Sequence, residues 1–252
     1  MSTSPKAVFT PIKSSRTFEE VSNRIKKFIF DGVFRPGDKL PPETELAQQF
    51  NVGRQSIREA LRILELSGFI TIQKGGRGGA VIKDTISNTI SRLFLDAFLM
   101  EKISIEELTV ARVEIEKTVL KYVIRNADRS DIRSLQENIR KSREKIENNE
   151  LVIEENIQFH KLLAQASKNH LFMIVVEAIS TAVRHFMSQL GPDSEFSDNK
   201  KWYDESIIRS KNTLKFHQHI LDAIIANDLE QAVEQLEAHL HEVKDRLQLL
   251  VC

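Results

Sequence analysis

The 252-residue chain is long enough for two domains, and its hydrophobic content of 41% and charged content of 29% are ordinary for a soluble globular protein. Its only cysteine, Cys252, excludes an intrachain disulfide and favours a reducing compartment, so we expect a cytoplasmic protein. The formal net charge of +0 hides a split: residues 1–83 carry 14 Lys and Arg against 8 Asp and Glu, and the remainder carries 22 against 28. A basic front half suits a module that binds a polyanion.

Two stretches bear on targeting and on membranes. Residues 1–16 are polar, contain no basic-plus-apolar leader and are predicted to form a disordered arm. The longest apolar run, residues 171–183, is interrupted by Glu177 and followed by Arg184, and we interpret it as too short and too polar to cross a bilayer. No membrane partner is expected.

Residues 17–83 are predicted to form a winged helix-turn-helix domain that starts with two short helices. Apolar residues at helical spacing predict a first helix over residues 18–31. A second helix is predicted over Glu43–Phe50, because Pro42 precedes it where a first helical turn tolerates proline. Asn51 then occupies the turn, and asparagine tolerates the left-handed backbone that such a turn often requires.

A third helix is predicted over residues 54–67, with two chemically distinct faces. The buried face follows the spacing i, i+3, i+4, i+7 and consists of Ile57, Ala60, Leu61 and Leu64. The opposite face carries Arg54, Gln55, Arg58 and Arg62. Arginine can pair with guanine or phosphate and glutamine with adenine, and the first turns of the second helix are where a helix-turn-helix presents such groups. In isolation, the alternative of an arginine-rich solvated face stays open.

A two-stranded wing is predicted after this helix. Strand-forming residues over 69–73 and 80–83 flank the glycine-rich, dibasic stretch 74–79, which indicates a hairpin whose tip can approach a phosphate chain closely. The same glycines do not fit a nucleotide phosphate loop, because no Lys-Ser/Thr pair follows them and no helix starts directly after them. The turn before the third helix and the wing after it together favour a DNA-binding role for the arginines of this helix over a role as solvated surface residues.

Residues 84–252 are predicted to form an all-α bundle of six to seven helices, so the fold class is mainly α with one small β-hairpin. Ser104 with Glu107, and Asp228, are expected to cap two of these helices. The expected spans are 86–100, 104–127, 130–148, 151–168, 171–190, 205–226 and 228–250, with residues 191–199 as the one clear loop.

Four of the 7 histidines lie in the last two predicted helices, as two pairs spaced two residues apart. Residues with this spacing face different sides of a helix, so at most one of each pair points inward. His217 lies on the apolar stripe of its helix, His239 flanks the next stripe, and His160 follows Asn156 by one helical turn. Three imidazoles and an oxygen donor from three helices suit Zn²⁺, Ni²⁺ or a similar cation. The alternative, core and surface histidines without a metal, stays open on spacing alone.

The front segment resembles the winged helix-turn-helix of the GntR family of bacterial transcription regulators. The matching residues are Pro36, Gly37, Leu40, Pro41, Glu43, Leu46, Ala47, Val52, Arg54, Arg58, Glu59, Ala60, Leu61, Leu64 and Gly68. The resemblance implies operator contacts from the third helix and the wing tip, and the candidate residues are Thr44, Arg54, Gln55, Ser56, Arg58, Lys74, Gly75 and Arg77. Two positions depart from the family pattern: Thr44 stands where many members carry arginine, and Gly53 where serine or threonine usually caps the recognition helix.

The back segment resembles the FCD ligand-binding domain of the FadR subfamily of GntR regulators. The matching residues are Phe159, His160, residues 217–224, Ala232, His239 and Leu240, together with Arg112 and Glu116 of an Arg-x-x-Leu-Glu pattern in which Ile115 replaces leucine. Metal-binding members use an aspartate four residues before the first histidine, plus three histidines. The resemblance therefore implies a divalent metal site, for Zn²⁺ or Ni²⁺, at Asn156, His160, His217 and His239, with the neutral Asn156 in place of the aspartate.

The two resemblances imply a DNA-binding transcriptional regulator, expected to be a repressor and not an enzyme. Its effector is expected to be a small organic acid anchored by the metal and by Arg112, with Arg184 as a weaker candidate for the same role. Family members bind as dimers, which predicts a homodimer on a palindromic operator in double-stranded DNA. Two alternatives stay open: a metal-dependent enzyme that acts on such an acid, and a constitutive dimeric DNA-binding protein.

Overall fold

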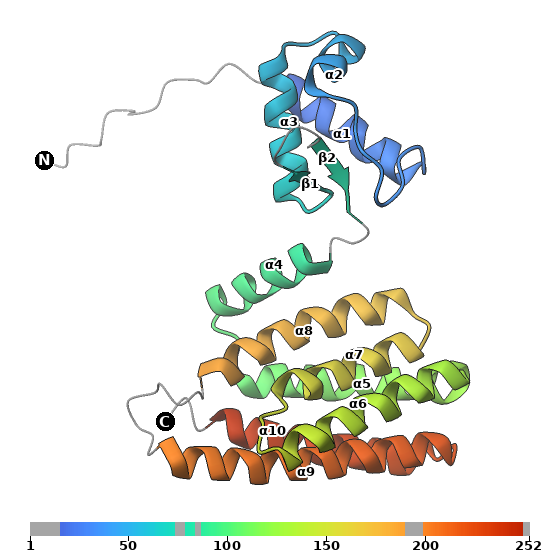
Figure 1. Cartoon of the computed structure of the whole chain (residues 1–252), viewed down its shortest axis with the longest axis vertical. Helices are drawn as coiled ribbons and strands as arrows, with labels where there is room; N and C mark the ends of the chain where they lie inside the picture. Colours follow the sequence, from blue (N-terminus) through green and yellow to red (C-terminus); the bar gives the residue numbers. More distant parts are fainter. Residues whose placement is uncertain (1–15, 74–78, 84–86, 190–198, 249–252) are drawn as a thin grey trace, which may run out of the picture. The chain divides into compact units, whose positions relative to one another are not determined.

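A computed structural model describes residues 16–73, 79–83, 87–189 and 199–248. These residues form ten helices and one two-stranded sheet, and their contacts divide the chain into two compact units, Met1–Thr89 and Ile90–Cys252 (Figure 1). The predicted fold class, mainly α with a small β-hairpin and a helical bundle, is confirmed. Of the predicted arm over residues 1–16 and the predicted loop over residues 191–199, only Arg16 and Asn199 are among the described residues, and each begins a helix.

The N-terminal unit contains the three predicted helices, α1 (Arg16–Phe30), α2 (Glu43–Phe50) and α3 (Arg54–Leu66). Asn51 links α2 to α3 with a φ of 51° and a ψ of 49°, the left-handed conformation predicted for this turn. The predicted inner face of α3 is buried, and it packs into a core with residues of α1 and α2: Val21, Ile25, Leu46, Ile57, Ala60, Leu61 and Leu64. This core fixes the opposite face of α3 at the surface.

The wing consists of β1 (Ile70–Gln73) and β2 (Gly79–Ile82), which pair antiparallel with Ile70 opposite Ile82 and Gln73 opposite Gly79. The segment before α2 runs along the other side of β2: the Leu40 amide donates to the Ala80 carbonyl, and the Ile82 amide donates to the Asp38 carbonyl. Because the inner residues of both strands are buried in the domain core, the base of the wing is held firmly against α3. The wing tip, residues 74–78, lies outside the described residues.

Seven helices follow the wing, as predicted. They are α4 (Ser87–Met100), α5 (Ile105–Asn126), α6 (Arg129–Glu147), α7 (Ile153–Ala166), α8 (His170–Gln189), α9 (Asn199–Ile225) and α10 (Leu229–Gln248). The capping box of Ser104 and Glu107 is present at α5, and the Asp228 carboxylate accepts from the Gln231 amide at α10. The predicted start of α9 was wrong, because this helix begins at Asn199 rather than at residue 205.

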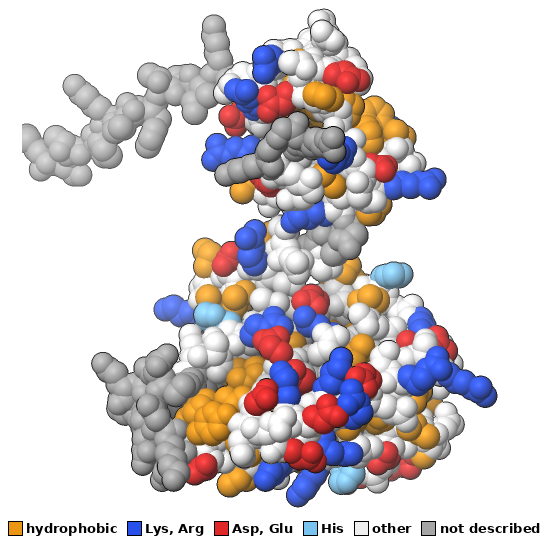
Figure 2. Space-filling view, in the orientation of Figure 1, with side chains coloured by type: hydrophobic (Ala, Val, Ile, Leu, Met, Phe, Trp, Pro, Cys, Tyr) orange, Lys and Arg blue, Asp and Glu red, His pale blue; other side chains and the backbone are white. Residues whose placement is uncertain are grey.

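The bundle core lies where α5, α7, α9 and α10 meet: α10 packs against α9 and α5, and α7 packs against α5, α6 and α8 (Figure 1). The central residues are fully buried and apolar: Leu120, Leu135, Phe159, Leu163, Ile220, Leu221 and Leu236. On the face of this unit drawn in Figure 2, acidic and basic side chains are interspersed, as expected for a solvated surface. Five helices, α6 included, contribute these residues and therefore share one interior.

The prediction that the apolar run on α8 is too short to cross a bilayer was wrong on length and composition, because α8 as a whole is long and apolar enough. The helix nevertheless packs as part of the bundle, against α7 and α5. Two of its charged side chains form ion pairs with α7: Glu177 with Lys161, and Arg184 with Glu154. Through these contacts and buried residues such as Ile179, one face of α8 packs in the bundle.

Candidate functional site

The recognition face of α3 lies at the surface of the N-terminal unit. Arg54, Gln55 and Arg58 are exposed and Ser56 is partly exposed, as is required of groups that contact DNA. Arg58 Nε lies 2.8 Å from Glu43 Oε2 on α2, and its side chain stays 58% exposed, so the ion pair orients the guanidinium without burying it.

The other predicted DNA contacts divide into two groups. Thr44, on the first turn of α2, is exposed. Lys74, Gly75 and Arg77 belong to the wing tip and lie outside the described residues, so they stay predictions.

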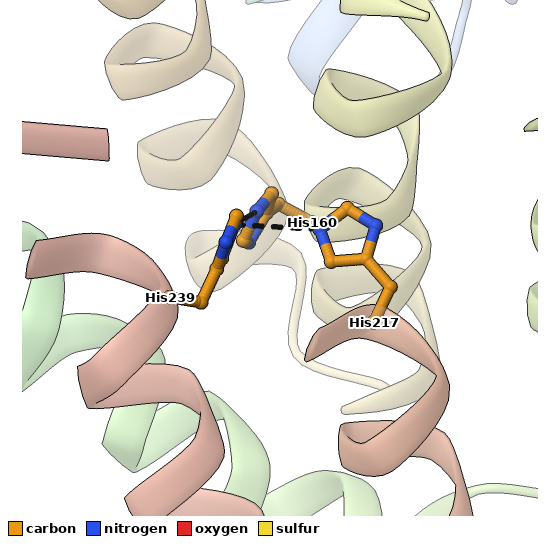
Figure 3. A group of neighbouring side chains, drawn as sticks. All are labelled: His160, His217 and His239. Atoms are coloured by element: carbon orange, nitrogen blue, oxygen red, sulfur yellow. Dashed lines mark hydrogen bonds between the residues drawn. The ribbon is translucent and has the colours of Figure 1, made fainter. Parts of the chain in front are cut away.

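In the C-terminal unit, three histidines from three helices converge. His160 of α7, His217 of α9 and His239 of α10 are each buried, and one nitrogen from each ring lies within 4.8 Å of the others. His239 Nε2 lies 3.2 Å from His160 Nε2 and 3.3 Å from His217 Nε2, and the three rings point toward one another (Figure 3). The neighbouring residues in the predicted pairs, His219 and His241, are exposed, as their helical spacing predicts.

Two of the three nitrogen separations and the chemistry of the rings suit a metal ion, and all three nitrogens lie within 4.8 Å of one another. Imidazole nitrogens bound to one Zn²⁺ at about 2.0–2.1 Å are separated from each other by about 2.9–3.4 Å, which brackets the two separations between the Nε2 atoms. Burial holds the pKa of His217 and of His239 well below the ordinary imidazole value, and nearby positive charge lowers it further. The rings are therefore neutral at physiological pH, which is the form that binds metals.

Glu116 and Arg112, one helical turn apart on α5, fix the orientation of His160. Glu116 Oε2 lies 2.5 Å from His160 Nδ1, and Arg112 Nε donates to Glu116 Oε1 at 2.6 Å. Burial by itself would raise the pKa of Glu116, but its interactions with His160 and Arg112 lower it to about 2. An ionised carboxylate on Nδ1 selects the tautomer whose Nε2 faces the other two histidines, an arrangement that supports metal-binding histidines in proteins.

Asn156, the fourth predicted ligand, lies one turn before His160 on α7. Its Oδ1 atom is buried and has no hydrogen-bond partner among the described residues. A buried carbonyl oxygen without a partner is costly, so this atom suits an oxygen ligand of a cation or an acceptor for a bound molecule.

A small cavity opens beside His160 and His239. Its walls include Arg112, Asn156, His160, His239 and Arg246. The other effector candidate, Arg184, is not part of this lining, because its guanidinium forms a two-pronged pair with Glu154 at 2.8 and 2.9 Å. The structure therefore brings Arg112 to the predicted site and places Arg184 elsewhere.

Two site residues were not singled out from the sequence as site residues. Arg246 follows His239 by seven residues and Val243 by three, so it continues the buried stripe of α10. Glu116 follows Arg112 by one turn and shares its face. In both cases, the sequence feature that could have identified the residue is a helical spacing that places a charged side chain on the same face as a residue that points inward.

Comparison with known proteins agrees with this geometry. The model described as bacterial regulatory proteins, gntR family, matches residues 17–81, and the FCD domain model matches residues 107–242. The HTH-type transcriptional repressor NanR of Enterobacter sp. (strain 638) is 29% identical over 237 residues, which cover 92% of this chain and 86% of that protein. NanR of Escherichia coli (strain K12) is 28% identical, covering 92% and 85%. A solved Streptococcus agalactiae GntR structure shares the fold, with a TM-score of 0.68 and 20% identity over 91% of this chain and 99% of that one.

Proposed function

The chain belongs to the GntR family of bacterial regulatory proteins and carries an FCD domain, and from this premise we propose how its two domains act together. It is a ligand-responsive DNA-binding transcriptional regulator and not an enzyme. We infer that it is a repressor of the FadR subfamily, whose operator affinity is set by a small organic acid bound in the helical bundle. The relatives named repressor support the direction of control.

The observation that carries the proposal is the buried histidine triad, of which His160 and His239 line a cavity that Arg112 also lines. The proposed metal ligands are Asn156, His160, His217 and His239. A divalent cation held there, Zn²⁺ or Ni²⁺, would offer open coordination positions to a carboxylate oxygen of the acid.

Arg112 supplies the second anchor for the acid. Its Nε is committed to Glu116, which leaves the terminal nitrogens of the guanidinium for the ligand. A carboxylate paired with a buried, oriented guanidinium gains charge-assisted hydrogen bonds that a neutral ligand lacks.

On the DNA side, we propose that the protein acts in the cytoplasm as a homodimer on a palindromic operator. Arg54, Gln55 and Arg58 would enter the major groove, and Ser56 and Thr44 would contact phosphates. The wing tip, with Lys74, Gly75 and Arg77, would follow the backbone or the minor groove. Binding of the acid would change how the two DNA-binding domains of the dimer sit on the operator.

Arg112→Gln is expected to remove most of the affinity for organic acids. The wild-type protein, purified with its metal, should be stabilised by members of an organic-acid panel in a thermal-shift screen, and the best acid should then be titrated by calorimetry. Loss of one buried charge-assisted pair, about 1.5–3 kcal/mol, should weaken binding by about tenfold to a hundredfold.

Arg184→Gln is the matched control, because it removes an arginine that pairs with Glu154 outside the cavity lining. It should bind the acid as the wild type does. An Arg112→Gln protein that folds, keeps its metal and binds the acid as tightly as the wild type would contradict the proposed effector site.

A further inference from the structure

Arg58 differs from the two other arginines on the predicted recognition face of α3. Its Nε atom lies 2.8 Å from Glu43 Oε2 on α2. Among the described residues, neither Arg54 nor Arg62 forms an ion pair, and both side chains are exposed. The carboxylate of Glu43 therefore acts on one guanidinium of the three.

The pair of Glu43 with Arg58 contributes orientation rather than stability. The two side chains are 36% and 58% exposed, and ion pairs at such exposure add little to the free energy of unfolding. The helices that carry them are fixed, because Leu46 of α2 and Ile57 and Leu61 of α3 are buried in one core. Glu43 therefore holds the Arg58 side chain from a position that does not move relative to α3.

The contact leaves the terminal nitrogens of Arg58 available. Glu43 accepts from Nε, and no other hydrogen bond of Arg58 is found among the described residues. Two parallel N–H groups of a guanidinium match the O6 and N7 acceptors of guanine. An arginine loses rotamer freedom when it binds DNA, and the pair with Glu43 imposes part of that loss before DNA arrives.

The same carboxylate disfavours contacts with phosphate. Glu43 and Glu45 lie in the first turn of α2, on either side of Thr44, and α2 carries no basic residue. A carboxylate beside a phosphate is unfavourable by charge, so Arg58 gains less from a phosphate alone while Glu43 is next to it. A base contact that needs a fixed guanidinium is favoured over contacts that any sequence offers.

We propose that Glu43 is a positioning residue that sets the base specificity of Arg58. This rests on the proposed function, in which Arg58 enters the major groove. Glu43 holds the guanidinium so that its terminal nitrogens meet a guanine at one base pair of each operator half-site. Without Glu43, the guanidinium reaches phosphates and other bases as readily as that guanine.

The test measures a specificity ratio, which is the affinity for a selected operator divided by the affinity for a scrambled duplex at the same salt. Fluorescence anisotropy on the full chain supplies both values. In Glu43→Ala the ratio should fall by about twofold to tenfold, the change expected when one long side chain is no longer held in place. Operators changed at one base pair at a time should place this loss at the base pair where Arg58→Ala loses discrimination.

Glu45→Ala is the matched control, because it removes a carboxylate from the same turn of α2 that accepts from Gln49 and not from Arg58. It should raise affinity for both duplexes equally and keep the wild-type ratio. In an Arg58→Ala background, Glu43→Ala should leave the ratio unchanged, because the positioning residue has no guanidinium to hold. Should Glu43→Ala fail to fold, as judged by circular dichroism, Glu43→Gln decides the matter by a fall in the ratio that Glu45→Gln does not show.

Three results would overturn the inference: Glu43→Ala keeps the wild-type ratio, its loss falls at base pairs other than that of Arg58, or Glu45→Ala lowers the ratio as much. Failure of the proposed DNA contact looks different, because Arg58→Ala itself then loses discrimination at no base pair. Failure of the inference alone leaves that loss in Arg58→Ala and an unaltered ratio in Glu43→Ala.

Discussion

The double variant His160→Ala, His217→Ala is expected to lose its metal and, with it, the response to organic acids. Elemental analysis of the purified wild type should find about one Zn²⁺ or Ni²⁺ per chain, and the double variant should fall to background. The reason is that two of three converging imidazoles are removed, and one histidine with a neutral amide cannot hold a divalent cation tightly.

The control for this loss is the pair His219→Ala, His241→Ala, which changes exposed histidines on α9 and α10 and should retain full metal content. Glu116→Gln should give an intermediate result, with metal affinity lowered about 10–100-fold, because His160 loses the carboxylate that orients it. A double variant that keeps the wild-type metal content would show that the triad is not the metal site.

Arg58→Ala is expected to lower affinity for the operator by about 100-fold or more and to leave metal content intact. A guanidinium in the major groove that pairs with a base contributes about 1–3 kcal/mol of discrimination, and its loss also removes one cation from the interface. The protein should stay folded, because the ion pair of Arg58 with Glu43 is exposed and such pairs stabilise little.

The measurement is fluorescence anisotropy on an operator selected from random duplexes, at fixed salt, with a scrambled duplex of the same length. Arg140→Ala, in the other unit, should bind as the wild type does. Equal operator affinity for Arg58→Ala and the wild type would refute the assignment of α3 as the recognition helix.

Patterns of neighbouring residues in the sequence predicted most of the helices. The bounds of α2 followed from Pro42 and the turn at Asn51, and the buried face of α3 followed from apolar periodicity alone. The start of α9 was missed, because polar residues such as Asp204 precede the apolar stripe and Trp202 does not by itself continue it.

The candidate site was predictable only in part. Spacing decided that His217 points inward and His219 outward, since two residues on a helix differ by about 200°. That His160, His217 and His239 meet at one point depends on the packing of three helices, which the periodicity of any one helix does not contain. Helical spacing left a shared metal site as one of two alternatives, and the family resemblance favoured it.

The paired charges show the same limit. A buried arginine is rare unless it is paired, and its place on the apolar stripe of the last helix did not by itself mark Arg246 as a site residue. The Arg112–Glu116 pair lies within α5 at a spacing of one helical turn, whereas the contact of Glu116 with His160 depends on how α5 packs against α7.

The most direct test of the account measures the coupling between the two domains. Operator affinity of the metal-loaded wild type should be titrated by anisotropy with and without a saturating organic acid from the thermal-shift screen. We expect the acid to change operator affinity by about 5–150-fold, the size of ordinary allosteric coupling, and we expect Arg112→Gln to abolish this change at the same acid concentration. An operator affinity that is identical with and without an acid known to occupy the cavity would contradict the claim that the bundle controls the DNA-binding domain.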